Sequence, residues 1–279
     1  MPLRQQSAEM KTKAILDNIY KTTIANLAKV KLLASYNDYL YRNFPENIPD
    51  SVKSELQQKA GESFGDMIVT LFSKKEVKDL SGFGYLHAYA NFEVDDSTDK
   101  RDFLQIILQQ EWITYFAYVE AFFQDICRFI YSFDNHLLAH HKKQIQWEDI
   151  IQAGDYDSLL NLMIESTVEK SGYKNLADTI ELWNRPPYLF NILIDKDDLL
   201  MLRWSIATRN LIIHNNSRMT KECYDLTTQV AILRKAKSSV EPIGSKLDLD
   251  TTSLTGLYIL LHNIVEGVYN AITAKYFSQ

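Results

Sequence analysis

The segment that decides the fold is residues 100–133, which read KRDFLQIILQQEWITYFAYVEAFFQDICRFIYSF. Its apolar residues recur at spacings of three, four and seven, the period of an α-helix that buries one face. The stripe consists of Ile106, Ile113, Phe116, Phe123, Cys127 and Ile130. We therefore expect one long helix over Lys100–Phe133.

The same period recurs on both sides of this segment. The other expected helices cover residues 10–42, 51–71, 147–153, 155–169, 176–183, 196–214, 221–235 and 253–277. Only nine glycines and six prolines occur in 279 residues, which leaves few tight turns. Residues 81–94, around Gly82 and Gly84, are compatible with either a short hairpin or an irregular loop. The sequence predicts an all-α protein.

Composition indicates a soluble, cytoplasmic protein. The N-terminus has no apolar signal segment, and the most apolar stretch, residues 254–272, is interrupted by His262 and Glu266. Cys127 and Cys223 both fall in apolar-periodic segments, which favours reduced core thiols. The polar segment DDSTDK at residues 95–100 is the expected boundary between an N-terminal helical region, 1–95, and a second helical domain, 96–279.

The segment that carries chemistry is residues 204–216, WSIATRNLIIHNN, at the end of an expected helix. In it Arg209-Asn210-x-x-x-His214 resembles the motif of the HEPN family. In that motif four to six residues separate an arginine from a histidine, and the residue directly after the arginine is usually asparagine. The polar exit after His214 and the later GSKLDL run before the terminal helix are also similar to the family. The resemblance extends from about Lys100 to the C-terminus and implies a helical bundle of HEPN type, with the N-terminal region as an addition.

Helix geometry limits how these side chains can meet. Asn210 and His214, four residues apart, share a helix face, whereas Arg209 lies about 140° around from His214. Only a long forked side chain reaches back to the same pocket, which suits arginine. Either Asn215 or Asn216 can adopt the left-handed conformation that ends the helix.

Glu120 stands on the apolar stripe of the 100–133 helix, where a carboxylate needs a cationic partner. Arg209 and Arg203 are the candidates. A structural ion pair and a catalytic role are both open, and in either case we expect Glu120→Gln to lower the melting temperature.

The resemblance implies a metal-independent endoribonuclease, typical of toxins and phage-defence effectors, that acts as a homodimer. Arg209, Asn210, His214 and Glu120 are its expected catalytic residues, RNA is its substrate, and an antitoxin or defence protein is a further possible partner. We expect no cofactor, no bound metal and no membrane association. A non-catalytic helical module that binds a nucleotide or a protein is the alternative.

Three further features bear on this reading. The terminal helix carries more apolar residues than one face of a lone domain needs, which favours it as the dimer surface; they are Leu257, Leu260, Leu261, Ile264 and Val268. The net charge is −6, yet residues 217–247 hold six basic and three acidic residues. The cluster around His136, His140 and His141 has no carboxylate or cysteine at metal-ligand spacing and is expected to be a solvated connection.

Overall fold

The structure, a computed structural model, describes residues 3–43, 100–140, 146–172, 175–235 and 240–278. Eight α-helices and one 3₁₀ helix occupy these ranges, with no β-strand among them. They are α1 (Leu3–Asn43), α4 (Lys100–Phe133), η1 (Asn135–His140), α5 (Trp147–Ala153), α6 (Tyr156–Gly172), α7 (Leu176–Trp183), α8 (Lys196–His214), α9 (Lys221–Leu233) and α10 (Thr251–Phe277). The all-α prediction is confirmed.

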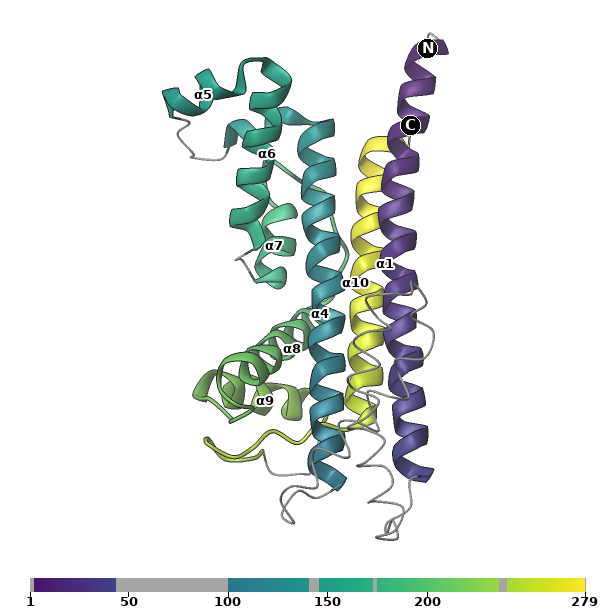
Figure 1. The fold of residues 1–279 in the computed structure, drawn as a ribbon, viewed down its shortest axis with the longest axis vertical. Helices are drawn as coiled ribbons and strands as arrows, with labels where there is room; N and C mark the ends of the chain where they lie inside the picture. The colour runs from purple at the N-terminus through teal and green to yellow at the C-terminus, as the bar shows by residue number, and fades with distance from the viewer. Residues whose placement is uncertain (1–2, 44–99, 141–145, 173–174, 236–239, 279) are drawn as a thin grey trace, which may run out of the picture. The chain divides into compact units, whose positions relative to one another are not determined.

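Helix α4 lies at the centre of the fold, between α10 and the helices α6, α7 and α8 (Figure 1). It is apolar on almost every side. Its buried side chains are Leu108, Trp112, Tyr115, Phe116, Val119, Phe122, Phe123, Ile126, Cys127, Phe129, Ile130 and Tyr131. A helix of this kind has to be covered by several neighbours at once. The exposed side chains among residues 104–133 are Ile106, Gln110, Ala117, Ala121, Asp125, Ser132 and Phe133. Ile106, expected on the buried stripe, is thus exposed.

One side of α4 is covered by α10, which runs parallel to it. The ring of Tyr115 lies 6.2 Å from that of Tyr258 near the start of α10, and Phe133 lies 5.7 Å from Phe277 at its end. The contacts therefore advance in the same direction along both helices. Each such aromatic pair contributes about 0.5–1.5 kcal/mol beyond the area it buries.

Helix α1 packs along α10 in the opposite direction. Tyr20 stacks on Tyr269 with 4.2 Å between ring centroids, and the Tyr269 hydroxyl donates to Asp17 at 2.8 Å. Further along α1, the Lys31 ammonium lies 4.5 Å from the centroid of Tyr258. Rising numbers in α1 thus meet falling numbers in α10, so that α1, α10 and α4 form three neighbouring rods (Figure 1).

The other side of α4 is covered by α6, α7 and α8. Phe123 stacks on Trp183 of α7 at 5.3 Å, and Trp112 meets Trp204 of α8 edge to face at 5.7 Å. The Trp112 indole N–H also donates to the Ser205 carbonyl at 3.1 Å. These contacts fix the position of α8, which carries the expected motif, against the middle of α4.

Several expected helices have the bounds that the sequence predicted, namely 100–133, 147–153, 176–183 and 196–214. Asp195 caps α8 as expected, its carboxylate accepting from the Asp198 backbone N–H at 2.7 Å. The expected helix at 51–71 and the ambiguous stretch at 81–94 lie outside the described residues.

The expectation that α10 offers an apolar dimer surface is wrong. All five of the apolar residues named for that surface are at most 6% exposed within a single chain, because α10 is covered by α4 on one side and α1 on another. The surplus apolar face that the sequence revealed is used inside the chain.

The same packing bears on the division of the chain. Residues 1–35 and 108–279 form one compact unit, and residues 36–107 form another. Residues 3–35, most of α1, therefore belong to the same unit as residues 108–279, while the boundary expected from the sequence at residue 95 stays a prediction. None of the described helices combines the length and the apolar character needed to cross a bilayer.

The packing of α1 on α10 predicts the effect of a core truncation. Leu27 is fully buried, so Leu27→Ala should lower the free energy of unfolding by about 2–5 kcal/mol. Leu32, in the same helix but 72% exposed, is the matched control, and Leu32→Ala should change it by no more than about 0.5 kcal/mol. Urea denaturation followed by circular dichroism measures both; equal losses would contradict the docking of α1.

Candidate functional site

Helix α8 ends in an unusual turn that places its last side chains. The Leu211 carbonyl accepts from the backbone N–H of both Asn215 and Ser217, each at 3.0 Å. Asn216 and Ser217 have φ angles of 48° and 57°, in the left-handed region that non-glycine residues rarely occupy. One of the two expected caps, Asn216, thus adopts the left-handed conformation, and the chain leaves the helix sharply just after His214.

The turn is held from both sides. The buried Ser217 hydroxyl donates to the Gln109 side-chain oxygen of α4 at 3.0 Å, and the Ser217 carbonyl accepts from Leu247 N–H at 2.7 Å. In the sequence, the polar exit and the later GSKLDL run are separate features. The contact between Ser217 and Gln109 could not be predicted from them, because only the fold brings residue 109 beside residue 217.

The expected contact between Glu120 and Arg209 is present. Arg209 Nη2 donates to Glu120 Oε2 at 3.1 Å, and Arg209 Nη1 donates to Asn210 Oδ1 at 3.4 Å. The side chains of Arg209 and Glu120 are 26% and 34% exposed. The fork of Arg209 therefore lies between a carboxylate and an amide at the edge of the buried face of α4, within reach of solvent.

The Arg209 guanidinium is incompletely satisfied. Its Nε atom is buried and has no hydrogen-bond partner among the described residues. An arginine offers five N–H donors in a planar fork that matches two oxygens of a phosphate. Because part of the side chain is exposed, Arg209 can donate hydrogen bonds to a phosphate while it keeps its hydrogen bond to Glu120.

Glu120 is held in its charged form at a cost. Burial raises the pKa of Glu120, and the positive charge of Arg209, which acts in the opposite direction, does not cancel this. The attraction between the two groups is therefore smaller than the loss of hydration of the carboxylate. We therefore expect the pair to orient Arg209 without stabilising the fold near neutral pH.

Asn210 and His214 are both exposed on the surface of α8. Neither a hydrogen bond nor an ion pair joins His214 to Glu120, Arg209 or Asn210, all of which the structure describes. Ideal helix geometry places His214 about 7.5 Å along the axis from Arg209 and about 140° around it. The fold thus assembles three of the four expected catalytic residues into one cluster and leaves the imidazole free at the helix end.

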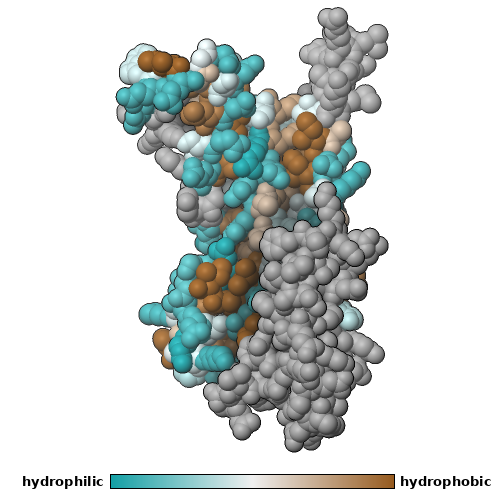
Figure 2. Space-filling model, viewed as in Figure 1, coloured by the Kyte–Doolittle hydropathy of each residue, from teal (hydrophilic) through white to brown (hydrophobic). Residues whose placement is uncertain are grey.

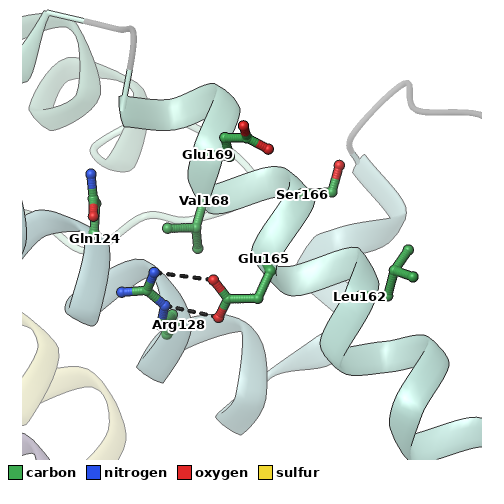
Figure 3. Close-up of a pocket in the computed structure, with 7 residues that line it drawn as sticks. All are labelled: Gln124, Arg128, Leu162, Glu165, Ser166, Val168 and Glu169. Carbon is green, nitrogen blue, oxygen red and sulfur yellow. Dashed lines mark hydrogen bonds and ion pairs between the residues drawn. The ribbon is translucent and has the colours of Figure 1, made fainter.

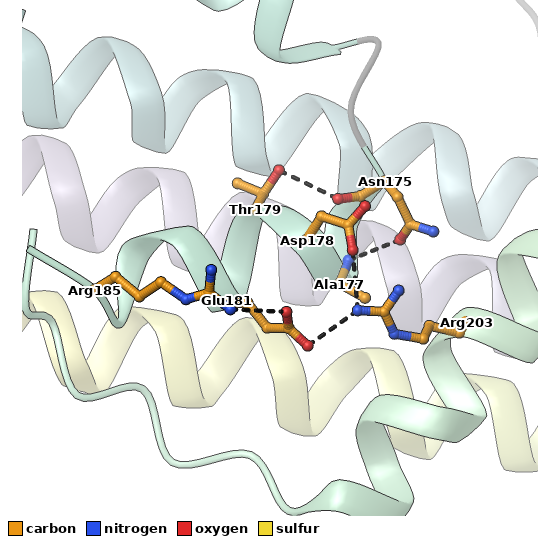
Figure 4. Close-up of polar contacts among 7 residues, drawn as sticks. All are labelled: Asn175, Ala177, Asp178, Thr179, Glu181, Arg185 and Arg203. Carbon is orange, nitrogen blue, oxygen red and sulfur yellow. Dashed lines mark hydrogen bonds and ion pairs between the residues drawn. The ribbon is translucent and has the colours of Figure 1, made fainter. Parts of the chain in front are cut away.

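Arg203, the other partner considered for Glu120, is engaged elsewhere. It donates to Glu181 at 3.0 Å and lies 2.9 Å from Asp178, both in α7 (Figure 4). Arg185 completes the group at 3.5 Å from Glu181. This network joins α8 to α7 and leaves Arg209 as the cation of the site.

A cleft of about 680 Å³ lies between α4 and α6, beginning one helical turn beyond Glu120 (Figure 3). Its cation, Arg128, is clamped by Glu165 through two hydrogen bonds of 2.8 and 3.0 Å and by Asp125 at 2.9 Å. Glu169 also lines the cleft. Because its positive charge is neutralised and carboxylates remain, the cleft is not an anion site.

Histidines and cysteines elsewhere do not form a competing site in the described ranges. His136 and His140 are exposed on η1, Cys127 and Cys223 are buried and form no disulfide, and no group of three described ligating side chains could hold a metal. His141 lies outside the described residues.

Comparisons of the chain with models of known protein families, with curated proteins and with solved structures gave no match. The site is therefore interpreted from its own residues.

The raised pKa of Glu120 predicts how stability depends on pH. The folded protein holds this proton more tightly than the unfolded chain, so the contribution of Glu120 to stability falls as pH rises above the ordinary value of 4.5. Glu120→Gln removes that fall, and its melting temperature should equal or exceed that of the wild type near neutral pH. The sequence predicted the opposite sign, a lower melting temperature for Glu120→Gln, and thermal melts decide between the two expectations.

Glu165→Gln is a control of opposite sign. In the wild type, hydrogen bonds from Arg128 lower the pKa of the Glu165 carboxyl. The contribution of Glu165 to folding stability is therefore present near neutral pH and is lost as pH falls below the ordinary value of 4.5. Thermal melts of both variants across pH 4 to 8 measure the two effects. A lower melting temperature for Glu120→Gln at neutral pH would show that the pair stabilises the fold.

Proposed function

We propose that this protein is a metal-independent endoribonuclease of HEPN type, acting as a homodimer. The observation that supports this most is the hydrogen-bonded cluster of Glu120, Arg209 and Asn210, with an exposed histidine, His214, at the end of α8, the helix that carries Arg209 and Asn210. A guanidinium, an amide and an imidazole are the groups that cleavage of a ribose phosphodiester requires. They provide charge neutralisation, orientation and proton transfer.

The reaction uses the ribose 2′-OH as the nucleophile. A base removes its proton, the 2′-oxygen attacks the adjacent phosphorus, and the bond from phosphorus to the 5′-oxygen breaks as an acid protonates that oxygen. The products are a 2′,3′-cyclic phosphate and a 5′-hydroxyl. No metal is needed for this sequence of proton transfers when charged side chains neutralise the phosphate.

Each residue of the site has a role in that sequence. Arg209 binds the non-bridging oxygens and neutralises the charge that grows on them, while Asn210 donates its amide N–H to the same phosphate. Glu120 orients the Arg209 fork through its 3.1 Å hydrogen bond. His214 transfers the protons.

One histidine per chain supplies an acid or a base, whereas the reaction needs both. A second copy facing the first across a two-fold axis provides the missing group. With α10 covered, we propose that α8 itself forms the dimer face. Ile213, next to His214, is 42% exposed, and Figure 2 shows a hydrophobic patch on the part of the surface formed by α8 and α9.

A toxin or phage-defence effector is the biological class that this activity fits, with an antitoxin or defence protein as its partner. A non-catalytic module that binds a nucleotide or protein is the outcome if the cleavage tests below fail.

The direct test is cleavage of total RNA by the His214→Ala variant. Loss of the proton-transfer group should slow cleavage on the order of 10²- to 10⁴-fold while the protein stays folded, because His214 is exposed and supports no core contact. His136→Ala, which removes an exposed histidine of η1, should cleave like the wild type. Wild-type cleavage should persist in EDTA and stop when the scissile nucleotide lacks its 2′-OH. A folded His214→Ala protein of full activity would refute the assignment.

The dimer is tested by placing a charge on the proposed face. Ile213→Asp should convert the dimer to a monomer in light scattering at micromolar concentration and abolish cleavage, because a buried carboxylate would have no partner there. Ile151→Asp, on α5 and 76% exposed in the wild type, should leave both unchanged. An active wild-type monomer would contradict the shared site.

A further inference from the structure

Beyond the catalytic cluster, two cations are held side by side where the chain leaves α8. Arg218 and Lys246 face each other across an isolated antiparallel β-bridge, and both are exposed. The pairing is fixed by backbone hydrogen bonds from Met219 N–H to the Ser245 carbonyl at 2.9 Å and from Gly244 N–H to the Met219 carbonyl at 2.8 Å. Residues directly opposite each other in such a pair project to the same side, with about 4.5–5.5 Å between their Cβ atoms.

Two like charges in this position oppose folding. Arg218 Nη1 donates to the Gly244 carbonyl at 3.1 Å, which orients the guanidinium but neutralises nothing. No carboxylate of the described residues pairs with Arg218. Asp248, two residues beyond Lys246, is the acidic neighbour on the Lys246 side of the bridge. The positive charge on the Arg218 side is therefore left for an external anion.

The backbone under Arg218 is rigid and strained. Asn216 and Ser217, immediately before it, are both left-handed, a conformation that is strained for residues other than glycine and is tolerated best by asparagine. The bonds of Ser217 to Gln109 and Leu247 hold this conformation. The turn fixes Arg218 relative to His214, four residues earlier, at no more than about 14 Å between Cα atoms.

We infer that Arg218, with Lys246 beside it, binds an RNA phosphate that neighbours the scissile one. The inference rests on the proposed function and deepens it, since it makes the substrate a single strand that spans at least two phosphates between Arg209 and Arg218. Arg218 is then a binding residue that positions the strand and does not touch the reacting atoms. Its forked donor group matches a phosphodiester oxygen pair.

The next cation along the chain provides the matched control. Lys221 is exposed and lies only three residues after Arg218, but its ammonium is paired with Asp225 at 2.7 Å. If only the local excess of positive charge attracted RNA, Lys221 and Arg218 would contribute alike. If the strand is held by Arg218, they differ.

The test is salt-dependent binding of a labelled single-stranded 2′-O-methyl RNA, which cannot be cleaved, followed by fluorescence anisotropy. Arg218→Gln should weaken binding by about tenfold and make the slope of log K against log salt shallower by about 0.7, the value for one single-strand phosphate contact. Arg218→Gln with Lys246→Gln should make it shallower by about 1.4 if both cations reach phosphate. Lys221→Gln should leave the slope unchanged, and circular dichroism should show that every variant is folded at the assay temperature.

Cleavage of an ordinary RNA, measured in parallel, separates the two proposals. Raised KM with unchanged kcat for Arg218→Gln supports both. RNA binding that depends on Arg218 in a protein that does not cleave supports the phosphate site and overturns the proposed nuclease. Two outcomes, in a protein that cleaves RNA, overturn the phosphate site alone. One is an Arg218→Gln variant that equals the wild type in KM and in salt slope. The other is a Lys221→Gln variant that binds RNA as weakly as Arg218→Gln. A wild type that neither binds nor cleaves RNA overturns both.

Discussion

The burial of α4 is the constraint on which the rest of the structure depends. Its large side chains, from Trp112 to Tyr131, point in nearly all directions, and removing them from water is the main source of stability available to the fold. Helix α10 covers one side, backed by α1, while α7 and α8 cover the other. The position of α8 is therefore set by the apolar surface of α4, through contacts such as that between Trp112 and Trp204.

The candidate site forms where this apolar contact ends. Glu120 lies at the margin of the buried face, and Arg209 reaches it from α8 as the two helices meet. Because water is partly excluded there, the pKa of Glu120 rises even beside a guanidinium. Such a pair stabilises the fold little, but it fixes the orientation of Arg209, because a partly buried carboxylate strongly prefers the orientation that keeps its cationic partner.

The end of α8 has a different kind of constraint, imposed by the backbone. Two left-handed residues turn the chain so that Ser217 is buried against α4 while His214 and Arg218 remain outside. A flexible exit would present the same side chains over many positions and would pay an entropic cost whenever a ligand fixed them. In the folded protein, hydrogen bonds from α4 and from residues 244–247 already hold the turn in one conformation, so a ligand does not have to order it. His214 and Arg218 are thus held apart on one rigid turn. The proposed binding of a single RNA strand requires such an arrangement, because the phosphates of the strand are regularly spaced.

The sequence by itself determined the helices and the identity of the candidate groups. The 3.6-residue period and the scarcity of glycine and proline predicted the all-α class and several exact helix ends, and the R-N-x3-H spacing with Glu120 identified the cluster, because these signals are local along the chain. Only the tertiary structure decided that α1 covers α10, that Glu120 chooses Arg209 over Arg203, and that Arg218 meets Lys246. Each of these contacts joins residues at least 20 positions apart, or selects between two equal charges. Sequence spacing carries no information on such choices, which depend on how apolar faces pack.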